Sequence, residues 1–147
     1  MVEVSVVNAH RRYRIPASPI RHYVRKVLTD EKKPRARVSV VCIDSRRCRR
    51  LNRRYLGHDY STDVLTFPLE EGVNLEGEIY VNLDRVRQQA REYNVSFRHE
   101  LARLIIHGVL HLAGYDDTGP AKSKRMKKAE NRYLEHWFGS AQARNVR

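Results

Sequence analysis

The sequence has few of the residues that build disulfide scaffolds and none of the long apolar runs that cross membranes. Only two of its 147 residues are cysteines, Cys42 and Cys48, which is too few for a disulfide framework, and we expect both thiols to be reduced. No stretch approaches the roughly 20 apolar residues that a bilayer span needs. The first residues form a short alternating stretch that contains an acid, which is not the pattern of a secretory signal. These absences predict a cytoplasmic protein that does not associate with membranes.

Acidic side chains are scarce, and they are unevenly distributed. The chain carries 29 Lys and Arg against 17 Asp and Glu, a formal net charge of +12, and 22 of the cations are Arg. Residues 59–84 contain seven acids and no base, whereas the regions on either side are strongly basic. Because the planar guanidinium group suits phosphate oxygens and stacks on bases, this composition favours a nucleic acid as partner. The alternative is a solvated basic surface that only keeps the protein in solution.

The hydrophobic periodicity predicts a single α+β domain over residues 1–147, in which helices cover a mixed sheet of about four strands. No repeat, low-complexity tract or long linker divides the chain. Alternating and β-branched stretches predict strands over residues 2–8, 37–43, 64–67 and 78–82. Helical periodicity, together with capping residues, predicts helices over residues 20–29, 44–56, 84–93, 96–113 and 122–138.

The predicted helix at residues 44–56 is basic along a single face. A helical wheel places six arginines within an arc of roughly 160° and places Cys48, Leu51 and Tyr55 on the opposite, core-facing side. Like charges three and four residues apart repel each other, so this face costs stability unless an anion lies across it. We therefore predict contact with RNA or DNA, and a solvated helix face is the alternative. The candidate RNA-binding residues are Arg46, Arg47, Arg49, Arg50, Arg53 and Arg54.

Two histidines in the predicted helix at residues 96–113 are candidate metal ligands. His107 and His111 are four residues apart, so both imidazoles lie on the same side of the helix and can reach one ion. With Glu100 and Arg103 they form a narrow polar stripe on a helix that is otherwise apolar. Because buried imidazoles without partners cost free energy, these side chains must bind something or be hydrogen-bonded.

The residues that follow this helix can supply a third ligand. Gly114 can adopt the left-handed conformation that turns the chain back, and Asp116 and Asp117 come five and six residues after His111. Two His and one carboxylate leave a fourth position open for water, which is typical of a catalytic zinc. The alternative is a pair of core histidines hydrogen-bonded to these acids or to the tyrosine before them. Gly108 stands where H-E-x-x-H zinc peptidases carry their catalytic glutamate, which argues against peptide hydrolysis by that route.

Several separated motifs resemble the YbeY family, bacterial metal-dependent endoribonucleases. The sequence HGVLHLAGYDD at residues 107–117 is similar to the family signature H-G-x-L-H-L-x-G-Y-D-H, and TDVLTFP at residues 62–68 is similar to T-D-V-L-S-F-P. Three further matches occur in the family order: Asn52, GEI at residues 77–79, and Met126 with Glu130. The resemblance covers about residues 37–135.

The resemblance implies a zincin-like α+β domain that binds one zinc ion per chain. His107 and His111 match the first two family ligands, and Asp117 takes the position of the third, which is a histidine in the family. Asp116 is the other candidate for the third ligand. The implied substrate is single-stranded RNA in ribosomal RNA maturation, with the ribosome or its precursors as partner. The oligomeric state does not follow from the sequence.

One functional residue of the family does not carry over. The family commonly has an arginine where this chain has Leu56, so Arg53 or Arg54 would have to supply the phosphate contact. A phosphate clamp cannot be transferred to a leucine. This replacement bears on the strength of catalysis and not on the metal site.

The predicted function is a zinc-dependent hydrolase, an endoribonuclease. The ion would act as a Lewis acid and acidify a metal-bound water, and either this water or the RNA 2′-hydroxyl would attack the phosphodiester. His58, His99 and Glu100 are candidate general bases, although Glu100 is expected to pair with Arg103. Two competing hypotheses are a ribosome-associated RNA-binding assembly factor with a structural metal, and a metal-dependent peptidase or hydrolase of other small substrates.

Overall fold

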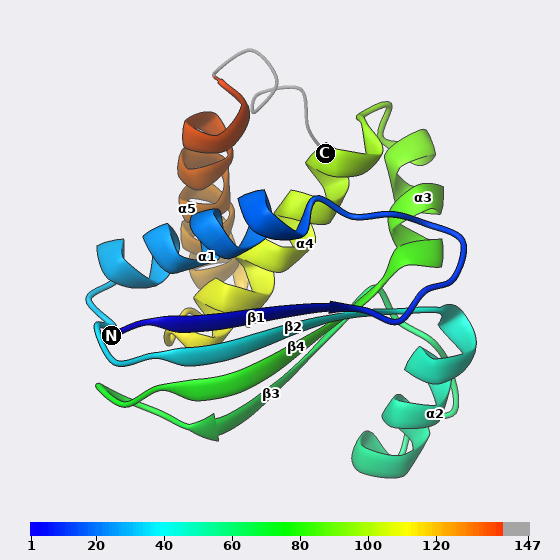
Figure 1. Cartoon of the computed structure of the whole chain (residues 1–147), viewed down its shortest axis with the longest axis horizontal. Helices are drawn as coiled ribbons and strands as arrows, with labels where there is room; N and C mark the ends of the chain where they lie inside the picture. Colours follow the sequence, from blue (N-terminus) through cyan, green and yellow to red (C-terminus); the bar gives the residue numbers. More distant parts are fainter. Residues whose placement is uncertain (140–147) are drawn as a thin grey trace.

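The computed structural model describes residues 1–139, which form one four-stranded sheet and five helices (Figure 1). In chain order the elements are β1 (Glu3–Asn8), α1 (Ala17–Asp30), β2 (Arg37–Ile43), α2 (Ser45–Leu56), β3 (Val64–Glu70), β4 (Glu76–Asn82), α3 (Leu83–Glu92), α4 (Phe97–Leu112) and α5 (Pro120–Phe138). The predicted α+β class with a mixed sheet is confirmed. The prediction of one domain over residues 1–147 includes residues 140–147, which lie outside the described residues.

The sheet is mixed, with the strand order β1-β2-β4-β3. β1, β2 and β4 are parallel, whereas β3 is an edge strand that pairs antiparallel with β4. β2 lies inside the sheet because its β-branched sequence, RVSVVCI, suits a strand with neighbours on both sides. β3 continues through Pro68 to Glu70, beyond the predicted end at residue 67, because an edge strand tolerates a proline.

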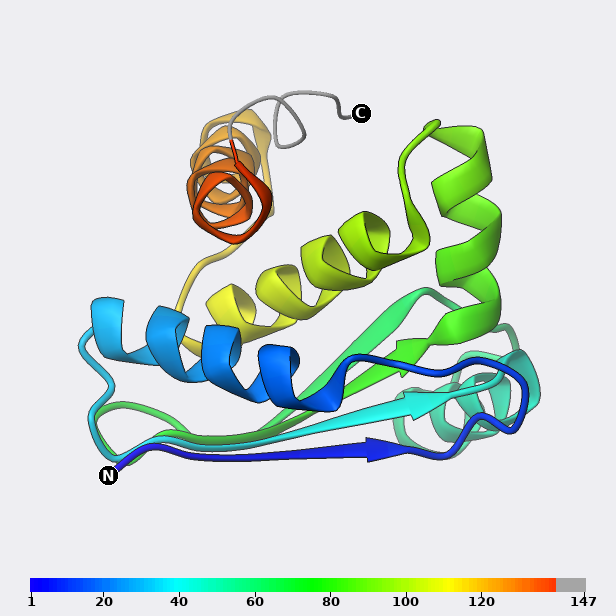
Figure 2. The ribbon, with the colours of Figure 1, turned by 45° about the horizontal axis from the view of Figure 1, so that its top comes forward.

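The helices are divided between the two faces of the sheet. Figure 2 shows α1 and α4 on one face, with α5 lying across α4 further from the sheet. The main hydrophobic core fills the space between this face and these helices. A second, smaller cluster formed by Ile43, Cys48 and Leu65 lies where α2 packs against the other face. Within residues 1–139, none of the helices has the length and apolar character needed to cross a membrane.

Two glycines allow α4 to lie unusually close to β4. A Cβ atom added at Gly108 would lie 2.9 Å from Cγ2 of Ile79, and one added at Gly77 would lie 2.7 Å from Cδ2 of Leu112. Both separations are shorter than carbon atoms tolerate, so any larger residue would push the helix and the strand apart. Because the histidines lie on the same half of α4, this close contact also sets their position relative to the sheet.

Proline and a carboxylate mark the beginnings of two helices. α1 begins at Ala17, earlier than the predicted residue 20, and contains Pro19 in its first turn. A proline is accepted there because its missing N–H group would have no partner within the helix. α2 begins as predicted, since the side chain of Asp44 accepts a hydrogen bond from the backbone N–H of Arg47 at 2.8 Å. Gly57 ends α2 in the left-handed conformation, with φ of 72°.

Asn82 joins the end of β4 to three neighbouring segments. Its side-chain oxygen accepts hydrogen bonds from the backbone N–H groups of Asp84 and Arg85 and so caps α3. Its amide donates to the backbone carbonyl of Thr62 at 3.0 Å, just before β3. Asp84 in turn accepts from the backbone N–H of Ser45 at 2.9 Å, which holds the beginning of α2. Two helices and the approach to β3 are thus fixed at one edge of the sheet.

We expect Asn82→Ala to lower the free energy of unfolding by about 1–3 kcal/mol, because it removes the α3 cap and the hydrogen bond to the carbonyl of Thr62. Urea denaturation followed by circular dichroism measures the change. Gln88→Ala, on the exposed side of the same helix, is the control and should change stability by no more than about 0.5 kcal/mol. Equal effects of the two substitutions would contradict the role assigned to Asn82.

Candidate metal centre

The polar stripe predicted on α4 is present, and it runs from the protein interior to the surface. Glu100 and Arg103 are fully buried, His107 is partly buried, and His111 at the end of the helix is exposed. Beyond the first turn, where Arg98 is exposed, the apolar residues of the helix are buried, as the sequence predicts. The two imidazole rings are nearly parallel, at 13°, with their centroids 6.4 Å apart. Both rings therefore lie on one side of the last two turns of α4.

A buried carboxylate from α5 fixes the ring of His107. Nδ1–H of His107 donates to Oε2 of Glu130 at 2.7 Å, and the other oxygen of Glu130 accepts from Nη1 of Arg103 at 2.8 Å. Asn131 accepts from Nη2 of Arg103 at 2.9 Å and completes the network. A histidine held through Nδ1 presents the lone pair of Nε2 outward, which is how proteins orient imidazoles that bind metals.

Asp117 lies opposite the free nitrogen of His107. The distance from Nε2 of His107 to Oδ2 of Asp117 is 3.8 Å. Two ligand atoms that share a tetrahedral zinc are about 3.4 Å apart, so this separation is close to that of a ligand pair. In the described part of the chain, however, no group of three His, Cys, Asp or Glu side chains is already arranged around an ion-sized position. The structure thus brings His107 and Asp117 together, and the ring of His111 lies on the same side of α4 as that of His107.

The neighbouring Asp116 has other partners. Its carboxylate accepts hydrogen bonds from the backbone N–H and the hydroxyl of Thr118, and Lys122 lies 3.4 Å away. These hydrogen bonds, that of the backbone N–H first, lower the pKa of Asp116 to about 2. Asp116 therefore stabilises the turn that follows α4, whereas Asp117 makes no comparable hydrogen bond among the described contacts and faces the histidine.

The electrostatics around His107 favour a cation. Burial alone would lower the pKa of this imidazole, but the hydrogen bond and charge of Glu130, with the charges of Asp117 and Asp63, outweigh burial and raise the pKa. The same carboxylates would attract a divalent ion. Two imidazoles and a carboxylate are also suitable ligands for zinc, so the side chains present fit such an ion.

Glu130 and Asp63 belong to the site, but the sequence spacing of the candidate metal ligands did not identify them. Glu130 was noted only as a match to the family order, and Asp63 only within the motif at residues 62–68. One signal was available in the sequence. Glu130 is an acid on the face of α5 that otherwise carries Met126 and Tyr133, and all three side chains are buried. A buried acid on an apolar helix face indicates a partner of opposite charge or a hydrogen-bond donor.

The candidate general bases lie in different surroundings. His99 and Glu100 are buried near the beginning of α4, and Glu100 accepts from Nε2 of Gln89 at 2.7 Å. Glu100 precedes His107 by seven residues, which is about 10 Å along the helix. Arg103 forms an ion pair with Glu130, and the pairing of Glu100 with Arg103 stays a prediction. His58 is exposed, and its Nδ1 lies 2.6 Å from the hydroxyl of Tyr60.

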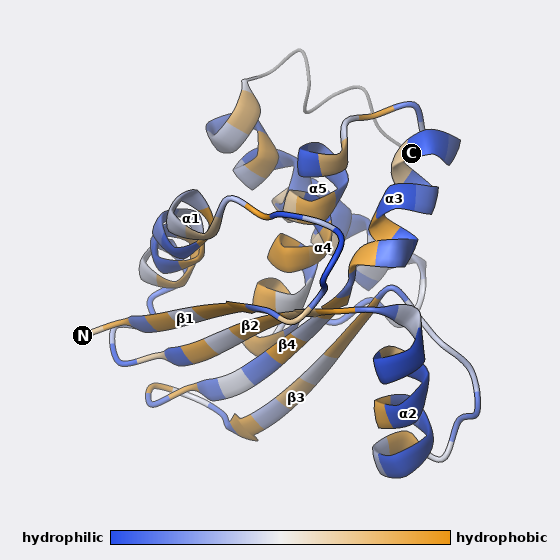
Figure 3. Cartoon of the chain, turned by 45° about the vertical axis from the view of Figure 1, so that its right-hand side comes forward, coloured by the Kyte–Doolittle hydropathy of each residue, from blue (hydrophilic) through white to orange (hydrophobic). Residues whose placement is uncertain are grey.

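The six arginines of α2 all lie on its exposed face, as predicted, while Cys48 and Asn52 face the protein. Figure 3 shows the helix as hydrophilic along most of its length. Tyr55 was expected on the core side but is largely exposed; it lies in the last turn of the helix, where its ring packs edge-to-face with that of Phe67. Leu56 next to it is also exposed.

Two of these arginines share an acidic partner from the loop after α2. Arg49 binds both carboxylate oxygens of Asp59, at 2.9 and 3.2 Å, and Arg53 lies 3.9 Å from the same group. The guanidinium of Arg54 lies over the ring of Tyr55 at 5.4 Å. Asp59 therefore partly neutralises the basic face near the C-terminal end of α2. From this end the chain continues toward Asp63.

Comparison with known proteins gives a consistent family relationship. Residues 5–138 match the family described as "Endoribonuclease YbeY". A protein of that name from Chlorobium phaeovibrioides is 43% identical over 131 residues, which is 89% of this chain and 88% of the relative. One from Salinibacter ruber is 38% identical over 140 residues, covering 89% of each chain. The solution structure of TM1509 from Thermotoga maritima is similar, with a TM-score of 0.64, 32% identity and coverage of 95% and 92% of the two chains.

We expect Glu130→Gln to weaken zinc binding by about 10- to 100-fold, because the ring of His107 loses the charged partner that orients it. Competition titration against a coloured zinc chelator measures the affinity well below the melting temperature of the variant. Glu135→Gln makes the same change elsewhere on α5 and serves as the control. If the affinity of the Glu130 variant stays within about twofold of the control, Glu130 does not support a metal site.

Proposed function

Because this chain belongs to the YbeY family of endoribonucleases, we propose that it is a zinc-dependent enzyme that cuts single-stranded RNA in ribosomal RNA maturation. The fold and the family together support RNA cleavage, and the orientation of His107 by Glu130 is the observation that supports the metal. The substrate would be ribosomal RNA or its precursors, on or near the ribosome, which implies a cytoplasmic location. The whole chain, residues 1–147, would act as one ribonuclease domain.

The proposed ligands of one zinc ion per chain are His107, His111 and Asp117. Asp117 is preferred to Asp116 because it faces Nε2 of His107, whereas the hydrogen bonds of Asp116 stabilise the turn. When bound, zinc would supply Lewis acidity toward a phosphodiester oxygen. Glu130 would keep Nδ1 of His107 protonated and its Nε2 available, and Arg103 would hold the carboxylate of Glu130 in place through its hydrogen bond.

The arginines of α2 are the proposed contacts to RNA phosphates. Arg53 and Arg54 lie in the last turns of the helix, and the loop that follows leads to Asp63, whose charge acts on His107. This connection supports a path for RNA from the basic end of α2 to the candidate metal centre. Arg54 is the better placed of the two to reach a phosphate, because Arg53 already lies near Asp59.

We expect purified protein to cut a single-stranded RNA and a chelator to abolish the cleavage. His111→Ala should lower the cleavage rate by more than about 100-fold and also reduce the zinc content measured by elemental analysis, because it removes a ligand. His136→Ala, an exposed histidine of α5, is the control.

Three outcomes would contradict the proposal in different ways. Cleavage that survives both the chelator and the His111 substitution would come from a contaminant. Tight, salt-sensitive RNA binding without cleavage would indicate an assembly factor. Cleavage of peptides in place of RNA would indicate a different hydrolase.

We also expect Leu56→Arg to raise kcat/KM for RNA by about tenfold, because it adds a cation at the end of α2 nearest the metal centre. Leu56 is exposed, so an arginine can be accommodated without loss of packing. Leu69→Arg, at an exposed leucine of β3, adds the same charge elsewhere and is the control. An equal increase in both variants would show that only net charge matters.

A further inference from the structure

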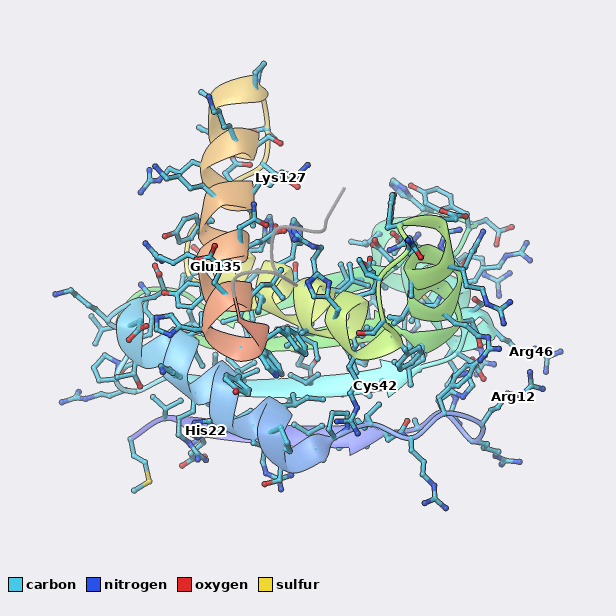
Figure 4. The ribbon with its side chains drawn as sticks, turned by 90° about the horizontal axis from the view of Figure 1, so that it is seen from above. Arg12, His22, Cys42, Arg46, Lys127 and Glu135 are labelled. Carbon is cyan, nitrogen blue, oxygen red and sulfur yellow. The ribbon has the colours of Figure 1, made fainter. Side chains whose placement is uncertain are left out.

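A basic cleft lies at the edge of the sheet where the three parallel strands end. His10–Arg12 follow β1, Asp44 follows β2, and Asp84 follows β4, so the parallel register brings all three segments to the same edge. They enclose a cleft of about 660 Å³ together with the first turns of α2. Figure 4 shows Arg12 and Arg46 extending from this end of the molecule. Ligands of open sheets with parallel strands commonly bind outside the carboxyl ends of the strands.

The cleft has a strong excess of positive charge. Five exposed arginines line it: Arg11, Arg12, Arg46, Arg47 and Arg50. Within residues 1–139, none of these guanidinium groups lies within 4.0 Å of a carboxylate oxygen. Five cations so close together repel one another, and this arrangement costs free energy unless an anion lies between them.

The two acids of the cleft are occupied by contacts within the protein. Asp44 caps α2 through the backbone N–H of Arg47. Asp84 accepts from the backbone N–H of Ser45 at 2.9 Å and from Nε2 of His10 at 2.8 Å. Burial opposes ionisation of Asp84, but these hydrogen bonds outweigh it and lower its pKa, and the charge of Arg12 adds a smaller contribution in the same direction. The acids thus fix the walls of the cleft and leave the arginines available.

The contacts of α2 divide its arginines into two groups. Arg49 and Arg53 lie near Asp59, whereas Arg46, Arg47 and Arg50 border the cleft. In the cleft, Arg11 and Arg12 from the segment after β1 lie with these three arginines of α2. Two separate segments that converge with the same charge make a site that a helix face alone would not make.

We propose that this cleft binds the sugar-phosphate backbone of the substrate RNA, several nucleotides from the bond that is cut. The planar forks of arginine match phosphate oxygens, and an open cleft suits a chain that passes through it. Arg47 precedes Leu56 by nine residues, about 13 Å along the helix, so the cleft lies away from the end of α2 that leads to the metal centre. That this RNA is the substrate of the enzyme rests on the proposed function.

The test measures RNA binding apart from cleavage. A short fluorescein-labelled oligouridylate is titrated in the presence of a chelator, at several salt concentrations, with wild-type protein, Arg12→Gln and Arg47→Gln. We expect each substitution to weaken binding by about tenfold at about 100 mM salt and to lower the slope of log K against log salt by about 0.7, because one phosphate contact is lost. The double variant should lose more than either single variant.

A matched control separates a specific site from general attraction. Arg37→Gln removes the same charge at the beginning of β2, at the opposite edge of the sheet, where Arg37 pairs with Glu3. We expect less than about a twofold change in this variant. Equal losses in Arg37→Gln and the cleft variants would overturn the proposal, and so would competition by polyglutamate as strong as that by unlabelled RNA.

Cleavage assays distinguish failure of this inference from failure of the proposed function. If wild-type protein cuts RNA and the cleft variants bind and cut equally well, the cleft is not the phosphate site, while the proposed function stands. If the cleft variants lose binding but wild-type protein never cuts RNA, the cleft is confirmed as a binding site and the proposed function fails. Thermal unfolding of each variant ensures that a loss of binding does not come from a loss of folding.

Discussion

The candidate metal centre depends on a carboxylate of α5 that an arginine and a histidine of α4 share. Glu130 accepts from Arg103 with one oxygen and from His107 with the other, and both contacts are within 2.8 Å. Leaving any of these groups buried and alone would cost several kcal/mol, whereas together they satisfy one another. The same interaction therefore holds α5 against α4 and orients the imidazole of His107. A displacement of α5 would leave Arg103 buried without its counter-ion and would also release the histidine.

The fold was largely predictable because its signals are local. Alternation, caps and helix-ending glycines involve residues a few positions apart, so each strand and helix was found close to its observed position. The exceptions occur where tertiary context decides. Pro68 was expected to end a strand, and only the edge position of β3 permits it to continue. Tyr55 was assigned to the core by its place on the helix wheel, but α2 extends beyond the part of the sheet that could bury it. The close approach of α4 to β4 at Gly108 depends on strand pairing that no periodicity encodes.

The site was only partly predictable, because some of its residues come from different elements and meet only through tertiary packing. His107 and His111 follow from a spacing within one helix, but Glu130 comes from the next helix, 23 residues after His107, and its role requires the crossing of α4 and α5. The arginines of α2 were predicted as one surface. The structure divides them, because Asp59 from the following loop lies beside Arg49 and Arg53, while the cleft at the strand ends adds cations from the segment after β1.

The distribution of charge explains how RNA and a metal can belong to one surface. Asp63, Asp117 and Glu130 surround His107, and on their own these carboxylates would repel a phosphate. A divalent cation held there would offset that repulsion, so RNA would approach the metal-loaded protein more readily than the metal-free one. The basic cleft needs no such ion, because its two acids are already hydrogen-bonded and, within residues 1–139, its arginines form no ion pair. In the proposed function, attraction of the RNA and reaction at the cut bond would thus be separate. The arginines would hold the backbone at any zinc concentration, and the acidic centre would accept a phosphate only when its cation is present.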